Sequence, residues 1–204
     1  MTAMDSQAFL LRNPLFTTRQ FAQASGRRPD SASRTLSRLA RDRTVVQITR
    51  GIWAQPSHPS FQPLGAVPYL LHNEQGYVSF LTALHLHGLL SQIPNTFQVA
   101  TTGHGRTLDS PIGRFEFLQI KPSMMVSGIE LTTQPAPYPL ASAEKALLDT
   151  FYLATRRGRR FSRLPELELD EFDAREFFRL LEEQVIDARI RSAIRRRYER
   201  LTTD

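Results

Sequence analysis

The sequence predicts an α+β protein with two parts. Segments in which apolar residues recur every three or four positions, as in helices, alternate with short runs of β-branched and aromatic residues, as in strands. A proline-rich segment near residue 60 separates a basic N-terminal part from a larger part of balanced charge. We therefore expect an N-terminal winged helix-turn-helix, followed by a mixed α/β C-terminal domain with a small sheet and C-terminal helices.

The composition restricts the class of protein. The 204 residues suffice for one large domain or two small ones. The chain has no cysteine, which excludes disulfides, thiolate nucleophiles and cysteine-ligated zinc. No run of about 18 apolar residues is present, so no membrane-spanning helix is expected. The first residues do not resemble a secretory signal, and we expect a cytoplasmic protein.

The net charge of +6 is concentrated near one end of the chain. Residues 1–60 contain nine arginines and three aspartates, whereas residues 61–204 contain equal numbers of basic and acidic side chains. Such an asymmetry favours a polyanionic partner for the N-terminal part. We expect that partner to be double-stranded DNA.

One predicted helix, Pro29–Asp42, has two unlike faces. Its apolar side carries Ala32, Leu36, Leu39 and Ala40. Its opposite side carries Ser31, Arg34, Arg38 and Arg41. Arginine bonds guanine edges or phosphates, and serine is short enough to let a helix lie close to the major groove. By itself, this pattern is equally compatible with a solvated surface helix.

The preceding residues complete a helix-turn-helix pattern. Thr17 or Thr18 is expected to cap a helix that ends at Gly26, because glycine readily adopts the conformation that follows a helix. The turn that follows consists of Arg27, Arg28 and Pro29. Asp30 is expected to cap the two-faced helix. Two helices joined by a short glycine-containing turn are typical of DNA-binding proteins.

A hairpin is predicted directly after the two-faced helix. Val45–Thr49 and Ile52–Ala54 are β-branched runs, and the Arg50-Gly51 pair between them favours a tight turn. A hairpin in this position corresponds to the wing of a winged helix. Trp53 is expected to pack on its inner face. The hairpin and the local charge excess together favour DNA binding over a solvated surface helix.

The expected DNA-binding residues divide by role. Arg34 and Arg38 are expected to read bases, while Ser31 and Ser37 keep the helix face shallow. Phosphates are expected to be held by Arg27, Arg28, Arg41 and Arg50. Phosphate contacts release counterions and steepen the salt dependence of binding, whereas base contacts set sequence preference.

Prolines define the expected domain boundary. They recur within Pro56–Pro63 and prevent a regular element there. We expect the DNA-binding domain at residues 1–56, a linker at 57–66 and the C-terminal domain at 67–204. Helices of the C-terminal domain are expected at 64–72, broken near Pro68, and at 76–90, 142–153, 174–183 and 187–201. Its strands are expected at 96–102, 113–120, 129–133 and, as a short edge, 138–140.

The C-terminal domain contains three groups of polar residues that could suggest a metal site, a phosphate-binding loop or a nuclease site, but none has the required spacing. His85 and His87 point to opposite sides of a helix, so they cannot share a metal ion. Gly103–Arg106 matches no phosphate-binding loop and is expected to be a strand connection. Glu144 and Lys145 are adjacent on a helix, unlike the carboxylates of a nuclease, and Lys145 is expected to pair with Asp149 at the surface. We therefore expect no catalytic residue, cofactor or metal, and no enzyme.

Two further basic groups allow more than one interpretation. Arg156–Arg160 forms either a second phosphate contact or a solvated loop balanced by the acidic residues of 166–173. In the last helix a packed stripe is expected to include Ile186, Ile190 and Ile194. Arginines occupy the remaining positions, and this helix is expected to dock on the domain, bind a partner or contact DNA.

Several stretches resemble the AbiEi-type antitoxins and transcriptional regulators of type IV toxin–antitoxin systems. They are TRGIWA in the predicted wing, GYVSFLTALHLHGL, IPNTFQVAT, ASAEKALLDTFY and the tail LPELEL followed by FD. The resemblance covers nearly the whole chain. It implies a repressor that binds inverted repeats in its own promoter and counteracts a partner toxin of the nucleotidyltransferase type. Because one winged helix reads a short site, we expect a monomer or a dimer on DNA.

Two other functions compete with this interpretation. The first is a nuclease tethered by a winged helix, for which Glu144 and Asp149 would be the acidic residues. The second is a plain transcriptional regulator whose second domain senses a ligand or a partner.

Overall fold

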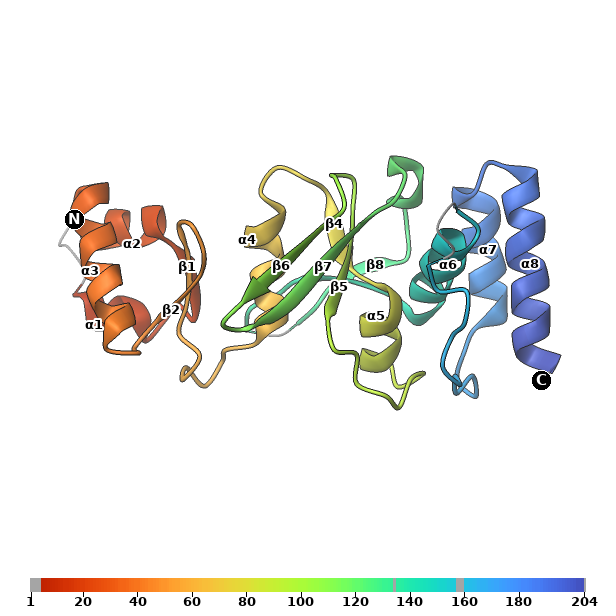
Figure 1. Ribbon diagram of the computed structural model, residues 1–204, viewed down its shortest axis with the longest axis horizontal. Coiled ribbons are helices and arrows are strands. Elements are labelled where there is room, and N and C mark those ends of the chain that lie inside the picture. Colours follow the sequence, from red (N-terminus) through yellow and green to blue (C-terminus); the bar gives the residue numbers. More distant parts are fainter. Residues whose placement is uncertain (1–4, 134, 157–159, 204) are drawn as a thin grey trace. The chain divides into compact units, whose positions relative to one another are not determined.

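The computed structural model describes residues 5–133, 135–156 and 160–203 (Figure 1). The chain divides into two compact units. The first comprises Met1–His72 together with Leu108–Arg114 and Thr133–Tyr138, and the second comprises Asn73–Thr107, Phe115–Thr132 and Pro139–Asp204. Within the described residues, no helix combines the length and the apolar character that crossing a membrane requires.

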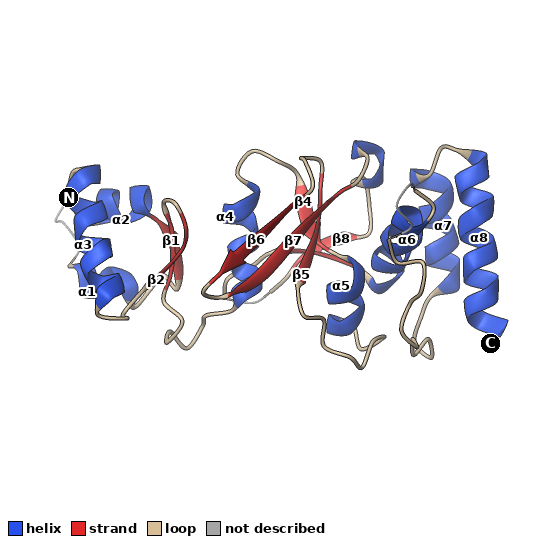
Figure 2. Ribbon diagram, viewed as in Figure 1, coloured by secondary structure: helices blue, strands red, loops and turns tan. Residues whose placement is uncertain are grey.

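The first unit begins with three helices and three short strands. In chain order these are α1 (Ser6–Leu10), β1 (Leu15–Thr17), α2 (Thr18–Ala24), α3 (Pro29–Arg41), β2 (Val46–Thr49) and β3 (Ile52–Ala54). The strands form an antiparallel sheet in the order β1-β3-β2, in which Phe16 pairs with Trp53. Figure 2 draws these strands in red and the helices of the unit in blue. The expected helices and the tight hairpin of this region are therefore confirmed.

An aromatic cluster holds these elements together. The Phe9 ring meets the rings of Phe16 and Phe21 edge-on, at centroid separations of 5.2 and 5.4 Å. Ala32 and Leu36 of α3 join the same core and are fully buried. Edge-to-face packing and the burial of apolar surface stabilise this arrangement. The apolar side of α3 therefore packs inward, as its spacing predicts, and the opposite side is left to solvent.

A second group of contacts extends the first unit. Helical turns η1 (Pro63–Ala66) and α4 (Val67–Leu71) follow the hairpin, and they bury Leu64, Ala66 and Val67. The Gln62 side-chain amide donates to the Ala136 carbonyl at 3.1 Å, and the Tyr69 hydroxyl donates to the Leu15 carbonyl at 3.1 Å. The stretch predicted as a linker thus ends in a helical turn whose side chains are buried.

A six-stranded mixed sheet lies in the order β6-β7-β5-β4-β9-β8. Its strands are β4 (Gly76–Val78), β5 (Phe97–Thr101), β6 (Arg106–Ser110), β7 (Gly113–Gln119), β8 (Ile129–Leu131) and β9 (Pro139–Ala141). The pairs β5–β7 and β4–β9 are parallel, whereas β4–β5 and β8–β9 are antiparallel. The expectation of an α+β protein with a small sheet is confirmed.

Three predictions about this sheet are wrong. Residues 76–78 form β4 rather than the start of a helix, because β5 and β9 supply hydrogen-bonding partners on both sides. The segment expected as a short edge is β9, which lies between β4 and β8. Residues 106–110, for which no strand is expected, form the edge strand β6. Each error concerns pairing between distant segments, which local patterns do not encode.

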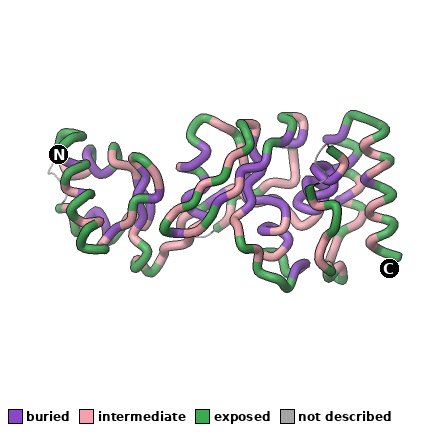
Figure 3. Tube along the Cα trace, in the orientation of Figure 1, coloured by how far each residue is buried: buried purple, intermediate pink, exposed green. Residues whose placement is uncertain are grey.

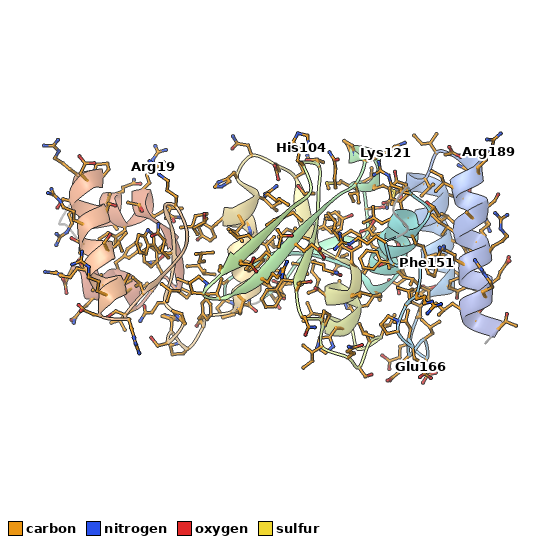
Figure 4. All side chains as sticks on the ribbon, in the orientation of Figure 1. Arg19, His104, Lys121, Phe151, Glu166 and Arg189 are labelled. Atoms are coloured by element: carbon orange, nitrogen blue, oxygen red, sulfur yellow. The ribbon has the colours of Figure 1, made fainter. Side chains whose placement is uncertain are left out.

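The second unit contains four α-helices within its described residues, and α6 lies at their centre. They are α5 (Phe80–Leu86), α6 (Ala143–Ala154), α7 (Ala174–Gln184) and α8 (Ala188–Thr203), and α6 packs against the other three. Every residue of α6 from Lys145 to Ala154 is buried, and Figure 3 draws most of this helix in purple, the colour of buried residues. Figure 4 places the labelled Phe151 among the interior side chains. The surface helix expected here is therefore a central one.

One member of the predicted C-terminal stripe does not pack. Ile186 is 80% exposed, because it precedes α8 and lies in the connection from α7. Ile190 and Ile194 lie on the side of α8 that faces the core, as expected.

Candidate nucleic-acid interface

The turn between α2 and α3 is built from specific backbone hydrogen bonds. Thr17 caps α2 by accepting from the Gln20 N–H at 3.2 Å, and the Gln20 side chain accepts in return from the Thr17 N–H at 2.7 Å. At the other end Gly26 adopts a φ of +63°, and the Arg27 N–H donates to the Ala22 carbonyl at 2.9 Å. These contacts fix where α2 starts and ends, and they confirm the expected role of Gly26.

The start of α3 differs from the expectation. Asp30 does not cap the helix, because α3 begins at Pro29 and Arg28, two positions earlier, occupies the capping position. Proline suits the first helical position, since it lacks the N–H that would remain unpaired there. Asp30 lies in the first turn instead, where a carboxylate still interacts favourably with the helix dipole.

The solvent-facing side of α3 carries the expected basic residues. Among the eight residues expected to bind DNA, only Ser31 is half-buried, and the other seven are exposed: Arg27, Arg28, Arg34, Ser37, Arg38, Arg41 and Arg50. Residues 34 and 41 are seven positions apart, so their backbone attachments lie roughly 10 Å apart along the helix axis. The face is therefore a continuous cationic strip with short serines between the arginines.

The charges of this strip are not neutralised within the described part of the chain. No ion pair there involves Arg28, Arg34, Arg38 or Arg41. The Arg27 guanidinium donates to the Thr35 hydroxyl at 3.2 Å, which holds it against α3 while its charge remains uncompensated. Arginines without carboxylate partners are available to phosphates or base edges.

The hairpin presents one further arginine. Arg50 is exposed at the turn between β2 and β3, and Gly51 adopts a φ of +80° that only glycine adopts without strain. Trp53 is 3% exposed, and its indole N–H donates to the Thr18 hydroxyl at 2.9 Å. Trp53 therefore has the packing role that was expected, and it ties the hairpin to the start of α2.

Two exposed arginines of the same unit are not among the expected contacts. Arg19 lies in the first turn of α2 and is labelled in Figure 4. Arg43 follows the C-terminus of α3 in the left-handed conformation, with a φ of +57°. The sequence contains a signal for the position of Arg19, since the expected cap at Thr17 puts Arg19 in the first turn of α2.

The second unit contains a buried polar cluster that differs from the expectation. Lys145 and Asp149 form the predicted ion pair, but both side chains are 0% exposed, so the predicted surface location is wrong. Asp149 also accepts from the Tyr77 hydroxyl at 2.9 Å and from the Ser79 hydroxyl at 2.7 Å. The physical reason is that α6 is buried from Lys145 to Ala154. The carboxylate is thus surrounded by three donors.

Burial changes the titration of this cluster. Desolvation lowers the pKa of Lys145, although the nearby Asp149 carboxylate opposes that change. Desolvation raises the pKa of Tyr77 well above its usual value, and the charge of Asp149 and its hydrogen bond add to the increase. The hydroxyl of Tyr77 therefore remains a donor to Asp149 throughout the physiological range.

The remaining candidate groups are engaged in structural contacts. His85 bonds the Leu90 carbonyl at 2.8 Å, and His87 bonds the Ala141 carbonyl at 2.7 Å. His85 is half-buried, and His87 is exposed despite its hydrogen bond. Glu144 accepts from the Asp173 N–H at 3.3 Å. Within the part of the chain that the structure describes, no three histidine or acidic side chains lie close enough to share a metal ion.

The Gly103–Arg106 loop is organised around Glu74. Its carboxylate accepts from the Arg106 guanidinium at 2.7 Å and from the Thr101 hydroxyl at 3.0 Å. Partial burial alone would raise the pKa of Glu74, but these hydrogen bonds outweigh that effect and lower it. The loop is therefore a strand connection held by an ion pair.

The two basic groups that were left open have different surroundings. Residues 157–159 of the Arg156–Arg160 group lie outside the described residues. In α8, Arg191 and Arg195 pair with Glu182, and Arg197 donates to the Ala154 carbonyl. Figure 4 shows the labelled Arg189 on the outward side of the same helix.

Comparison with known proteins adds no assignment. No protein-family model matches the chain, and no curated protein matches it significantly.

Proposed function

We propose that this protein is a sequence-specific DNA-binding repressor of transcription, whose first unit is a winged helix-turn-helix. The observation that carries the proposal is the cationic strip of α3, with its arginines free of carboxylate partners in the described part of the chain. The element order α1-β1-α2-α3-β2-β3 and the sheet order β1-β3-β2 support it, because they place a hairpin beside the helix that would enter the major groove.

The residues divide into two roles in this proposal. Arg34 and Arg38 contact base edges from the exposed side of α3. Phosphates on either side of the groove are held by Arg27, Arg28, Arg41 and Arg50, and Arg19 adds a contact at the start of α2. Ser31 and Ser37 let the helix approach the bases. One chain reads a half-site, and two chains read an inverted repeat.

Selection from a random-sequence DNA pool, followed by anisotropy titration of the enriched sequence, tests this proposal. The full chain is expected to enrich one motif, and Arg34→Ala is expected to lose about 1–3 kcal/mol of discrimination between that motif and a base-substituted one. Arg114→Ala is the matched control, since Arg114 is exposed, belongs to the same unit and pairs with Asp109 at 3.5 Å. Failure to enrich any motif would contradict the proposal.

The resemblance to AbiEi-type antitoxins extends the proposal to the second unit. In that role the protein acts in the cytoplasm, represses its own promoter and counteracts a nucleotidyltransferase-type toxin, without being an enzyme. Co-expression with a nucleotidyltransferase-like gene adjacent to its own tests this role. Rescue of growth supports it, and promoter repression without rescue reduces the protein to a plain regulator.

A further inference from the structure

A cleft of about 520 Å³ lies within the second unit, and none of its lining residues belongs to the proposed DNA-binding face. Strand β7, the end of α6, the segment after it and α8 all contribute to its lining, which comprises Leu118, Gln119, Leu153, Thr155, Arg156, Arg160 and Ile190. The volume falls in the range of sites that hold small organic molecules. The proposed function uses none of these residues.

Aliphatic side chains from three elements form the apolar part of the cleft. Leu118 and Leu153 are buried, and Ile190 is half-buried. They come from β7, α6 and α8 and pack against one core, so their positions are set by regular structure. A ligand that covers them removes apolar surface from water, which favours a hydrophobic body.

The polar part of the cleft is cationic. The Arg156 guanidinium lies 5.7 Å from the centre of the Tyr152 ring, and no ion pair within the described residues neutralises it. Arg160, the other arginine of the lining, forms an ion pair with the carboxylate of Glu116. On the same lining, the Thr155 hydroxyl donates to the Tyr152 carbonyl at 2.7 Å and the Gln119 amide donates to the Thr102 carbonyl at 3.4 Å, so these donors are already used.

Nearby negative groups are already engaged. The carboxylate of Asp187 accepts from the backbone N–H groups of Arg189 and Ile190, at 2.8 and 3.2 Å, and so caps α8. The final carbonyl of α6, that of Ala154, accepts from Arg197 at 3.4 Å. Of the two charged side chains in the described lining, Arg160 pairs with Glu116, and Arg156 has no carboxylate partner within the described residues.

We propose that this cleft binds a small amphipathic oxyanion, which has an apolar body and one carboxylate, sulfonate or phosphate group. The apolar body covers Leu118, Leu153 and Ile190, and the oxyanion accepts hydrogen bonds from Arg156. Arginine suits this role because its planar fork donates two parallel hydrogen bonds to such a group.

The probe for the test is 8-anilinonaphthalene-1-sulfonate, which combines a planar apolar body with a sulfonate and gains fluorescence in an apolar site. The native full chain is expected to bind it saturably at one site. Arg156→Gln removes the cation, and Ile190→Trp fills the apolar part while keeping both arginines. Each is expected to weaken binding about tenfold. Arg179→Gln, which changes an exposed arginine on α7, is the control and is expected to bind as the native chain does.

Two competitors distinguish the source of the oxyanion. Displacement of the dye by octanoate identifies a carboxylate site, and displacement by adenosine monophosphate identifies a phosphate site. The proposal is overturned if neither competes, if the native chain shows no saturable binding, or if either variant binds as tightly as the native chain. Thermal unfolding followed by circular dichroism establishes whether the variants are folded, and Ile190→Trp is left out of the test if its larger side chain prevents folding. In that case the test depends on the two competitors and on Arg156→Gln, which changes an exposed side chain and is expected to leave the fold intact.

Discussion

Lys145 and Asp149 form a buried ion pair, in which each charge is stabilised by the other. Both are fully removed from water, and Asp149 also accepts from Tyr77 and Ser79. Removing one member of such a pair leaves an uncompensated buried charge, which is far more costly than removing both. The cluster therefore makes the packing of α6 against β4 specific to these side chains.

Lys145→Met is expected to lower the free energy of unfolding by about 3–5 kcal/mol, because it leaves the Asp149 carboxylate buried without its cation. Combining it with Asp149→Leu is expected to restore part of that loss. Urea unfolding followed by circular dichroism measures both values. A single variant as stable as the native chain, or a double variant less stable than Lys145→Met, would show that the charges are not coupled.

Glu74 supplies a pH dependence whose sign follows from its partners. Hydrogen bonds from Arg106 and Thr101 outweigh the opposing effect of partial burial and lower the pKa of Glu74 from its usual 4.5. A carboxyl group with a lowered pKa in the folded state stabilises the fold above the unfolded value, and this stabilisation is lost as the pH falls through the lowered pKa. The window therefore lies below pH 4.5.

Glu74→Gln is expected to make the decline in stability below pH 4.5 less steep, since glutamine does not titrate. Melting temperatures of the native chain and the variant, measured from pH 6 to pH 3, check this expectation. Glu166→Gln is the matched control, because Glu166 is exposed on a loop. Identical pH profiles for all three proteins would be inconsistent with the assigned ion pair.

The C-terminus of α3 shows how an element can end under strain. Arg43 has a φ of +57°, in the left-handed region that glycine usually fills after a helix, and the Thr44 N–H donates to the Leu39 carbonyl at 2.9 Å. A left-handed conformation costs an L-residue roughly 1–2 kcal/mol. The same position keeps a cation beside the proposed DNA-binding strip.

Arg43→Gly is expected to raise the unfolding free energy of the first unit by about 1 kcal/mol, because it relieves the left-handed backbone. Arg43→Ala removes the same charge without that relief and is expected to bring no such gain. Trp53 is the only tryptophan of the chain and is buried in this unit, so its fluorescence during urea unfolding reports the difference. Equal stability of the glycine and alanine variants would exclude backbone strain at this position.

At the scale of the whole molecule, the excess of positive charge lies in one segment. Residues 1–60 hold nine arginines and three aspartates, and the rest of the chain is balanced. In the proposed DNA complex, the five phosphate contacts per chain, Arg19 included, predict a slope of about −4.5 for the logarithm of the binding constant against the logarithm of the salt concentration. This salt slope depends on the number of phosphate contacts, whereas sequence preference depends on the base contacts.

Arg27→Ala is expected to reduce the magnitude of that slope by about 0.9, while Arg34→Ala changes sequence preference more than salt dependence. Titrations at several salt concentrations on the selected motif measure both. Unchanged slopes in Arg27→Ala, Arg28→Ala and Arg50→Ala alike would remove these arginines from the list of phosphate contacts.

Much of the first unit could be predicted because its signals are local. The capping of α2 by Thr17, the glycine after it and the stripe of Ala32 and Leu36 each involve residues close together in the chain. The error at Asp30 is a shift of two residues in the capping position of a helix. Predictions for the second unit failed where a strand needed distant partners, as in β4 and β9.

The two faces of α3, the tight turn at Gly51 and the uneven charge could be predicted without a structure, since they depend on spacing and composition. The burial of Lys145 and Asp149, and the position of Arg156 beside an apolar cleft, became visible in the fold alone. Burial depends on packing between segments that lie far apart in the chain. Tyr77 donates to a carboxylate 72 positions along the chain, and no local pattern contains that contact.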